Sequence, residues 1–280
     1  CVLLGDTIDG KCKQNNTSDS AYEAVLKVLD RSNVAGPAWH FVIGNHDLYN
    51  FSRLQLYDMQ QFVPVSQRSE CTPEQMYYST SPHPSYLFIF LDPFEISTPG
   101  GISVQAVEAA QRTLDQKNPN IQIQGANWLA GLSEADQRYV PYNGACSAAQ
   151  LAWLSLTLQR SVADGQKVFV FCHCPLYAPC CRPSGLCWNS EEVLSVLHST
   201  GNVVSCVYGH DHDGGYACDA EGVHHILPPA VLEAHEHDNA HGIISCNGNE
   251  RYFEMEWIGR PPDAARHEWP RRMMFPSSVA

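Results

Sequence analysis

Four short apolar segments of this 280-residue sequence each end in a residue whose side chain can bind a metal ion. The segments and the residues that follow them are VLL (2–4) with Gly5-Asp6, WHFVI (39–43) with GNHD (44–47), KVFVFC (167–172) with His173, and VVSCVY (203–208) with GHDH (209–212). Glycine precedes the polar residue in three of the four endings, and it permits the sharp turn by which a strand passes into a loop. One such turn is ordinary, but four that carry carboxylate, amide and imidazole groups predict a shared metal site.

The segments between these strands predict an α/β fold. Apolar residues recur there at helical spacing, whereas further short apolar runs are typical of buried strands. We expect helices at 19–31, 103–117 and 148–162 and further strands at 86–91, 223–227 and 251–257. This alternation indicates a sandwich with helices on its outer faces, in which ligands gather beyond the carboxyl ends of the strands.

The remaining segments set the expected domain organisation. Residues 51–85 and 115–146 are polar and irregular, so we expect them to be insertions over the site. The segment after Gly259 is rich in proline and arginine. We therefore expect one catalytic domain at 1–259, followed by a loosely packed tail at 260–280.

Charge and hydropathy restrict the partners of the chain. The 17 Lys and Arg against 30 Asp and Glu give a formal charge of −13, which argues against a nucleic acid or an anionic membrane surface as partner. No apolar run reaches the length of about 18 residues that a membrane-spanning helix needs. An anionic small molecule is still compatible with this charge, because metal cations can supply the positive field that holds it.

The twelve cysteines are unevenly spread, with five of them between Cys172 and Cys187. Their even number would suit disulfide bonds in a secreted protein, but a domain of this size does not need such cross-links. We favour reduced thiols in a cytoplasmic protein. A structural zinc site in the cluster is disfavoured, because two C-x₂₋₄-C pairs at zinc-site spacing do not occur there.

The GHDH ending has a geometry of its own. Residues two apart in an extended segment point the same way, so His210 and His212 can reach one region while Asp211 points elsewhere. Two such imidazoles suit a pair of metal ions about 3.5–4 Å apart, with one ring on each ion. Imidazole and carboxylate ligands without thiolate favour manganese, iron or zinc in a catalytic site.

The order and spacing of these endings resemble a known superfamily. GDxxD, GNHD, a single His after a strand and GHxH are similar to the motifs of the calcineurin-like metallophosphoesterases, and the resemblance covers nearly the whole chain. NFSR (50–53) after GNHD and DGGY (213–216) after GHxH are narrower features, which resemble the manganese-dependent ADP-ribose/CDP-alcohol diphosphatase family. The resemblance implies a β-sandwich flanked by helices, an αββα fold. It also implies hydrolysis of the diphosphate linkage in ADP-ribose, CDP-alcohols and related nucleoside diphosphate compounds.

The same resemblance implies the metal ligands. One divalent ion, manganese by the resemblance, would use Asp6, Asn45, His173 and His210, and a second ion would share Asp6 and use His212. The superfamily's first motif, an Asp followed by His or Gln at the end of the first strand, would precede GDxxD and is not in this sequence. We therefore expect a fold without its first strand and a second metal site that is incomplete.

Further residues take roles from the resemblance. His46 would stabilise the transition state or protonate the leaving oxygen, and Asp9 would orient its ring; the alternative for Asp9 is a turn-capping carboxylate. The candidates for substrate binding are Arg53 as a phosphate clamp, Tyr49, Phe51 and Trp188 as partners of the base, and Asn143 as a positioning group. The alternatives are a surface salt bridge for Arg53, core packing for the aromatic residues and helix capping for Asn143.

Two other functions remain open from the sequence. One is a phosphomonoesterase or cyclic-nucleotide phosphodiesterase of the same superfamily, which NFSR and DGGY disfavour. The other is a binding scaffold that kept the fold and lost catalysis, which the set of intact ligand residues disfavours. For the enzyme we expect a monomer that acts on small molecules.

Overall fold

The computed structural model describes residues 1–31, 39–68, 70–233, 240–247, 250–259 and 269–276. The strands are β1 (Val2–Leu3), β2 (His40–Phe41), β3 (Tyr78–His83), β4 (Tyr86–Phe90), β5 (Lys167–Cys172), β6 (Val203–Tyr208), β7 (Gly215–Cys218), β8 (His224–Leu227), β9 (Ala240–Cys246), β10 (Tyr252–Gly259) and β11 (Arg272–Met274). The helices are α1 (Lys11–Gln14), α2 (Ser18–Arg31), α3 (Asn45–Asn50), α4 (Arg53–Asp58), α5 (Val104–Lys117), α6 (Ala148–Ala163) and α7 (Ser190–His198).

The largest sheet has six strands in the order β3-β4-β5-β6-β8-β7. Strands β4, β5, β6 and β8 are parallel, and the antiparallel strands β3 and β7 lie at its two edges. The central strands β5 and β6 are almost wholly buried, which fits their apolar sequences because a parallel sheet is covered on both faces. Both strands run the same way, so the residues that follow them, His173 and Gly209-His210, lie at the same edge of the sheet.

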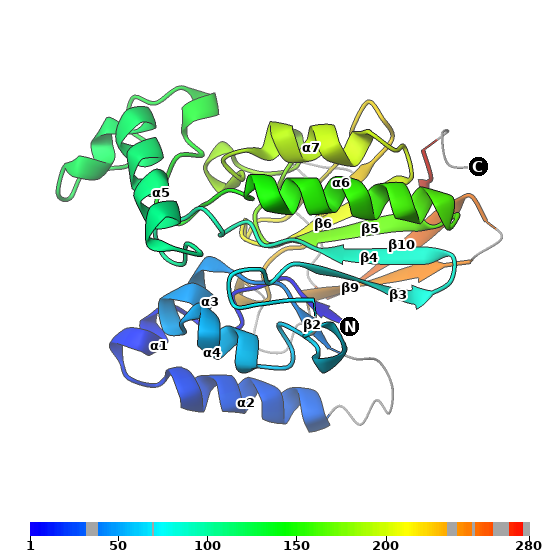
Figure 1. Cartoon of the computed structure of the whole chain (residues 1–280), viewed down its shortest axis with the longest axis horizontal. Helices are drawn as coiled ribbons and strands as arrows, with labels where there is room; N and C mark the ends of the chain where they lie inside the picture. The colour runs from blue at the N-terminus through cyan, green and yellow to red at the C-terminus, as the bar shows by residue number, and fades with distance from the viewer. Residues whose placement is uncertain (32–38, 69, 234–239, 248–249, 260–268, 277–280) are drawn as a thin grey trace.

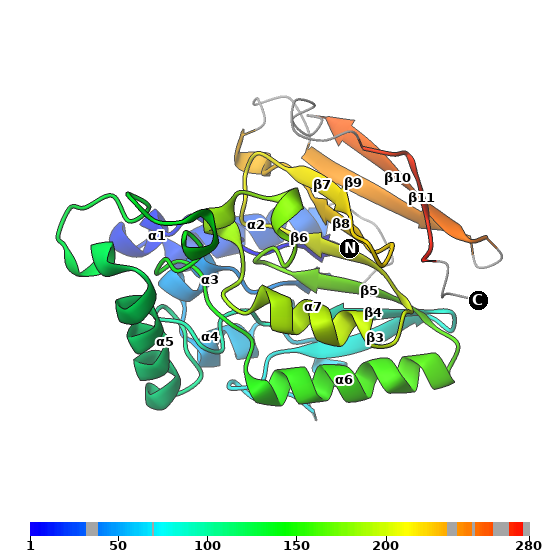
Figure 2. The same ribbon diagram turned by 90° about the horizontal axis from the view of Figure 1, so that it is seen from above.

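Two smaller sheets complete the layers. β1 pairs in parallel with β2, and β9 to β11 form an antiparallel sheet in the order β11-β10-β9. Helices α6 and α7 cover the face of the large sheet that is turned away from β9–β11 (Figure 2). Helices α1 to α4 lie together beside β1 and β2 (Figure 1). This stacking confirms the predicted α/β sandwich with helices on the outside.

The two longest predicted helices are confirmed as α5 and α6. Each begins after a serine whose hydroxyl oxygen accepts a hydrogen bond from a backbone N–H, from Ala106 to Ser103 and from Gln150 to Ser147. Such a cap satisfies one of the amide groups that the first turn of a helix leaves unpaired. The local sequence therefore sets where these helices start.

Residues 51–85, predicted to be irregular, contain two regular elements, α4 and β3. The sequence of β3, YSTSPH, is polar and includes a proline, which disfavours a strand interior. In the structure β3 is an edge strand whose register shifts between Thr80 and His83, so the proline falls where the ladder is already interrupted. Strands β7 and β9 and helix α7 also lacked a prediction from the sequence.

The predicted loose tail is wrong for residues 269–276. β11 pairs with β10, and the side chains of Met273 and Phe275 are buried. Apolar residues two apart on a strand point to the same face, so this short segment covers the core although its surroundings are rich in proline and arginine. Residues 260–268 and 277–280 lie outside the described part of the chain.

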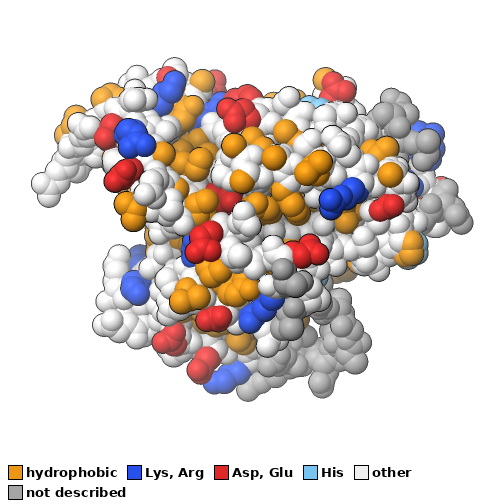
Figure 3. All heavy atoms as spheres, in the orientation of Figure 1, with side chains coloured by type: hydrophobic (Ala, Val, Ile, Leu, Met, Phe, Trp, Pro, Cys, Tyr) orange, Lys and Arg blue, Asp and Glu red, His pale blue; other side chains and the backbone are white. Residues whose placement is uncertain are grey.

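Three features concern the surface charge, the helices and the cysteines of the described chain. On the face drawn in Figure 3, Lys and Arg side chains are scattered among acidic and hydrophobic ones rather than gathered into a basic strip within the coloured part of the chain. Among the described residues, no helix combines the length and the apolar character that crossing a membrane requires. All twelve cysteines are free thiols in this structure.

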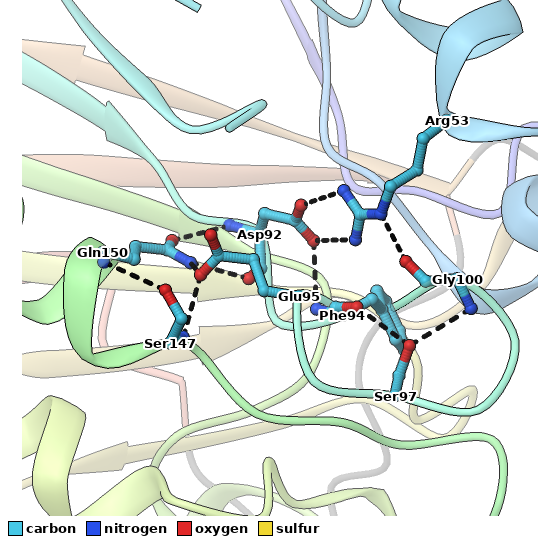
Figure 4. A network of polar contacts seen from close by, with 8 residues as sticks. All are labelled: Arg53, Asp92, Phe94, Glu95, Ser97, Gly100, Ser147 and Gln150. Atoms are coloured by element: carbon cyan, nitrogen blue, oxygen red, sulfur yellow. Dashed lines mark hydrogen bonds and ion pairs between the residues drawn. The ribbon is translucent and has the colours of Figure 1, made fainter. Parts of the chain in front are cut away.

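A buried polar network holds the end of β4 to helices α4 and α6 (Figure 4). Arg53 donates from Nη1 to Asp92 Oδ2 at 2.6 Å and from Nη2 to Asp92 Oδ1 at 3.3 Å, and its Nε donates to the carbonyl oxygen of Gly100. Gln150 of α6 closes the other side, since its Oε1 accepts from Asp92 N at 2.9 Å and its Nε2 donates to Asp92 O at 2.8 Å. The prediction that Arg53 clamps substrate phosphate is therefore wrong in this structure, because its guanidinium is used by the scaffold.

Replacing Arg53 with glutamine is expected to destabilise the fold by about 3 kcal/mol or more, because it leaves the Asp92 carboxylate buried without its cation. Denaturant unfolding followed by circular dichroism measures this loss. The fraction of the variant that remains folded should have the same Michaelis constant as the wild type. A raised Michaelis constant with unchanged stability would instead restore the phosphate clamp.

Glu95 belongs to the same network and has an unusual protonation equilibrium. Its Oε2 accepts from the backbone N–H of Ser147 at 2.8 Å and from Gln150 Nε2, whereas Oε1 is buried with no hydrogen-bond partner in the described part of the chain. Burial, reinforced by the negative charge of Asp92, raises the pKa of Glu95 to about 7. A proton on the carboxyl group is therefore held more tightly in the folded state than in the unfolded chain.

The sign of this shift predicts how stability depends on pH. A raised folded-state pKa contributes stability that is complete below pH 4.5 and is lost as the pH rises through about 7. Glu95→Gln removes the titration, so its stability relative to the wild type should rise by roughly 2 kcal/mol between pH 5 and pH 8. Unfolding curves of both proteins across this range are the measurement, and parallel pH profiles would contradict the assignment.

Candidate active site

The ends of four strands bring Asp6, Asn45, His173 and His210 to one place. Asp6 Oδ2 lies 3.3 Å from His173 Nε2, and His173 Nε2 lies 3.1 Å from His210 Nδ1. One ligand atom from each of these three residues lies within 4.8 Å of the others. Asn45 lines the same cavity as Asp6 and His210. The residues predicted for one metal ion are thus neighbours in space, although they are up to 204 positions apart in the sequence.

The hydrogen bonds of the two imidazole rings leave their lone pairs facing each other. His173 Nδ1 donates to the carbonyl oxygen of Leu4 at 2.6 Å, so its Nε2 carries no proton in the neutral ring. His210 Nε2 lies 2.7 Å from Asn143 Oδ1, and Asn143 Nδ2 donates to three backbone carbonyl oxygens, which fixes the orientation of the amide. His210 Nε2 must therefore donate, and its Nδ1 holds a lone pair. With both rings neutral, two such lone pairs 3.1 Å apart would repel each other. Burial alone would lower the pKa of His173, but attraction to Asp6 raises it, so either a proton on His173 Nε2 or a metal ion beside the two rings relieves this repulsion.

Asn45 supplies a further sign of a cation. Its side-chain oxygen Oδ1 is buried and has no hydrogen-bond partner among the described residues. A buried amide oxygen without a partner is unfavourable, and a metal ion would satisfy it. Carboxylate, imidazole and amide oxygen ligands fit manganese, iron or zinc, so the residues present suit the metal that the sequence predicts.

The backbone at two of the candidate ligands is strained. Asp6 and His210 have positive φ angles of 53° and 71°, which residues with a side chain adopt rarely, and Gly5 precedes Asp6 with a φ of 93°. A Cβ atom at Gly44 would lie 2.1 Å from Asp6 Oδ1, so only glycine leaves room for that carboxylate. The glycines that the sequence places before the ligands therefore serve the close approach of strand ends.

Asp47, the last residue of GNHD, locks the ends of β1 and β2 together. Its buried carboxylate accepts from the backbone N–H of Asp6 at 2.9 Å, Thr7 at 3.0 Å and Gly44 at 2.9 Å. Burial, and then the negative charge of Asp6, raises the pKa of Asp47 to about 7. Asp47 had no predicted role, and its position in the GNHD motif was the signal that could have revealed one.

The charges of the site favour cation binding. Burial alone would raise the pKa of Asp6, but attraction to His173 and a hydrogen bond with that ring outweigh burial and lower the pKa. Burial, and then repulsion by His173, lowers the pKa of His210 to about 3. At neutral pH Asp6 is therefore a carboxylate and His210 is a neutral ring, the forms in which both residues bind metals.

The site opens into a cavity of about 380 Å³. His212 and Tyr49 line this cavity, and His212 Nδ1 lies 3.2 Å from Glu233 Oε1. The full lining is Asp6, Asn45, His46, Tyr49, Leu129, Tyr142, Arg182, Ser184, Gly185, His210, Asp211 and His212. Its volume lies in the range that small-molecule sites occupy, roughly 300–1,000 Å³.

His46 lines the cavity, but the predicted pair with Asp9 is not formed. The Nδ1 atom of His46 accepts from the backbone N–H of Gly10 at 2.8 Å, whereas Asp9 Oδ1 accepts from the backbone N–H of Lys11 at 2.7 Å. Asp9 is therefore the turn-capping carboxylate of the alternative interpretation. The backbone bond still fixes the ring, because it places the proton of neutral His46 on Nε2.

Three other predicted substrate contacts belong to the scaffold. Phe51 is buried and packs edge-on against Tyr22 at 5.7 Å between ring centroids. Trp188 is buried in a small cluster with Ala110 and Leu114. Asn143 is fully buried and holds His210, so it neither caps the following helix nor lines the cavity. Arg53 binds Asp92, as described above. Core packing decides the role of each aromatic residue, and the local sequence does not reveal it.

The structure adds lining residues that sequence reasoning missed. Leu129 and Tyr142 come from the 115–146 segment, which confirms that part of this predicted insertion lies over the site. The ring of Tyr142 lies 5.7 Å from that of His210. Arg182, inside the cysteine-rich stretch, also lines the cavity, and no motif in the sequence marked it.

Known proteins are similar to this chain in sequence and in fold. Residues 2–214 match the family model described as calcineurin-like phosphoesterase. A Danio rerio protein named manganese-dependent ADP-ribose/CDP-alcohol diphosphatase is 36% identical over 270 residues, which cover 94% of this chain and 82% of the relative. A protein of the same name from Arabidopsis thaliana is 34% identical over 250 residues, which cover 89% of this chain and 76% of the relative.

A solved structure agrees with the sequence relatives. The crystal structure of a dimetal phosphatase from Danio rerio matches with a TM-score of 0.85 and 33% identity, covering 98% of this chain and 83% of that chain. The chain is therefore a dimetal phosphohydrolase of the calcineurin-like phosphoesterase family, to which it belongs together with relatives named manganese-dependent ADP-ribose/CDP-alcohol diphosphatase.

Proposed function

We propose that this chain hydrolyses the diphosphate linkage of ADP-ribose, CDP-alcohols and related nucleoside diphosphate compounds, with two manganese ions as cofactors. The observation that carries the proposal is the convergence of Asp6, His173 and His210, whose ligand atoms lie within 4.8 Å of one another beside a cavity of about 380 Å³ that Asp6 and His210 line. The names of the relatives supply the substrate class. The chemistry of the ligands supports a catalytic rather than a structural metal, because thiolates take no part.

The candidate ligands form two sets, one for each cation. Asp6, Asn45, His173 and His210 would hold one cation, and Asp6 with His212 would contribute to the second. When bound, such cations lower the pKa of water, so that a nucleophile forms near neutral pH, and they neutralise the phosphate oxygens. The negative chain can thereby accept an anionic substrate.

His46 acts on the phosphate through its free ring nitrogen. Because Nδ1 accepts from Gly10 N–H, Nε2 carries the proton and can donate to a phosphate oxygen as charge builds up in the transition state. The leaving group is itself a phosphate ester, which needs little protonation near neutral pH. We therefore propose charge stabilisation as the main contribution of His46.

A hydrolysis panel tests the proposed function. The substrates are ADP-ribose, CDP-choline, CDP-glycerol, a cyclic nucleotide and a simple phosphate monoester, each with manganese and with EDTA. We expect turnover of the three diphosphates with manganese and its loss with EDTA. Strong monoester or cyclic-nucleotide turnover with none on the diphosphates would reject the proposal in favour of another enzyme of the superfamily.

A further inference from the structure

We propose that Arg182 binds the phosphate group that is not attacked, and that this contact selects diphosphate-linked substrates over simple phosphate esters. The inference rests on the proposed function and deepens it. It assigns recognition of the second phosphate group to a residue that lies outside the recognised motifs. Arg182 is a positioning residue for the substrate and takes no part in the chemical step.

The location of Arg182 is the first support. It lines the cavity together with Asp6, His46, His210 and His212, and it is the one Lys or Arg in that lining within the described part of the chain. Its side chain is 50% exposed, so the guanidinium is open to a ligand in the cavity. Arg53, the cation that the sequence suggested for this task, is used by Asp92 instead.

Asp211 fixes Arg182 beside the metal ligands. Asp211 Oδ2 accepts from the backbone N–H of Arg182 at 2.7 Å, and Asp211 Oδ1 lies 2.9 Å from Arg182 Nη2. Asp211 is buried and lies between His210 and His212 in the chain. The Asp211 carboxylate thus anchors Arg182 to the same loop that carries His210 and His212.

The guanidinium keeps donors for a phosphate. Arginine has five N–H groups, and the Asp211 carboxylate contacts the guanidinium at Nη2. The Nη1 atom lies 4.0 Å from Asp213 Oδ2, which is longer than a hydrogen bond. Nη2 carries two N–H groups, one on each of the paired edges of the guanidinium, so a single bond to Asp211 leaves either the Nε/Nη2 edge or the Nη1/Nη2 edge to pair with two phosphate oxygens, an arrangement that guanidinium favours over ammonium. Because one end of the group is already held, little conformational freedom is lost on binding.

The charge of the cavity makes such a contact necessary for a diphosphate. Cations at the strand ends would neutralise the phosphate that is attacked, but the second phosphate extends beyond them into a cavity whose lining includes Asp6 and Asp211. Arg182 offsets this charge. A monoester or a simple diester has no second phosphate for Arg182 to bind, so it would gain nothing from this residue.

Kinetics of Arg182 variants on two substrates test the inference. We expect Arg182→Gln to raise the Michaelis constant for ADP-ribose about 30-fold, with a smaller change in kcat, because the contact is present before and during the reaction. The effect on kcat/KM for bis(4-nitrophenyl) phosphate should be at least tenfold smaller. Arg182→Lys, which keeps the charge and loses the paired donors, should lie between the wild type and Arg182→Gln.

Arg112→Gln is the matched control, because Arg112 lies on α5 outside the cavity lining, is 64% exposed and pairs only loosely with Glu108 at 3.8 Å. It should leave both substrates unaffected. An equal loss on both substrates in Arg182→Gln and Arg182→Lys would overturn the inference, since Arg182 would then act only by holding the loop of Asp211. An unchanged Michaelis constant for ADP-ribose would overturn it as well.

Equilibrium binding separates this inference from the proposed function. Isothermal titration of the manganese-loaded protein measures its affinity for pyrophosphate and for orthophosphate. The two anions differ by the second phosphate, and the measurement requires no turnover. We expect Arg182→Gln to weaken the binding of pyrophosphate at least tenfold more than the binding of orthophosphate. If ADP-ribose is not a substrate but this difference is found, the proposed function fails and the Arg182 contact stands. Equal weakening of both anions would reject the contact even in an active diphosphatase.

Discussion

Asp6→Asn is expected to lower kcat/KM for the preferred substrate by about a thousandfold or more while the fold is retained. Asp6 Oδ2 contacts His173 at 3.3 Å, and the carboxylate carries the negative charge that two cations would share. Asparagine tolerates the positive φ of 53° at this position, and its oxygen can still accept from the backbone N–H of His46. The variant therefore removes the charge with little change in shape.

Asp9→Asn is the matched control for this experiment. Asp9 belongs to the same GDxxD motif, but its carboxylate caps the backbone N–H of Lys11, a contact that asparagine can also make. We expect the two variants to melt close to the wild type and only Asp6→Asn to lose activity. Comparable losses in both variants would show that Asp9 acts in catalysis after all.

Asn143→Ala is expected to weaken manganese binding by about 10- to 100-fold. Asn143 Oδ1 accepts from His210 Nε2 at 2.7 Å and so keeps the lone pair on Nδ1. Without this acceptor the proton can move to Nδ1, where it blocks the metal position. Isothermal titration with manganese measures the affinity directly, and activity should recover in part at high manganese concentration.

Asn118→Ala controls for general damage to the same insertion. Asn118 is also fully buried, and its Nδ2 donates to the carbonyl oxygens of Trp128 at 3.1 Å and Tyr139 at 2.8 Å. Both variants should therefore be less stable in thermal unfolding, but only Asn143→Ala should bind manganese more weakly. If the two variants lost affinity equally, Asn143 would have no specific role in orienting His210.

The ligands of the site could be predicted because strand ends are encoded locally. An apolar run followed by glycine and a polar residue marks the carboxyl end of a strand, and parallel strands bring these ends to one edge. Asp6, Asn45, His173 and His210 follow this logic, and the structure brings them together, whereas their assignment to one metal ion came from the resemblance to a known family. The layers of the fold were predictable for the same reason, since long apolar runs and helical periodicity do not depend on distant residues.

Roles that depend on tertiary packing could not be predicted. Phe51 and Arg53 lie four and six residues after GNHD, yet Phe51 enters the core and Arg53 turns to Asp92, a residue at the end of another strand. The partner of His46 is a backbone N–H, which has no signature in the sequence. Arg182 lies in a stretch dominated by cysteines and reaches the cavity only because Asp211 holds it there. Each of these outcomes depends on a contact between segments that the local pattern does not relate.

The first strand and the second metal site of the superfamily were expected to be incomplete in this sequence. The expectation of a missing first strand and an incomplete second metal site remains a prediction. Within the described residues β1 pairs with β2, and the sheet of β9 to β11 is separate from it. His212 lies on the cavity outside the compact group of Asp6, His173 and His210, so the described ligands of the second ion are fewer than those of the first.

Crystals of the manganese-loaded protein, with anomalous scattering recorded at the manganese absorption edge, would locate the ion itself. The proposed metal site predicts a strong anomalous peak within bonding distance of Asp6 Oδ2, His173 Nε2 and His210 Nδ1, with Asn45 Oδ1 as a further ligand. A protein saturated with manganese that shows no peak between these atoms would contradict it.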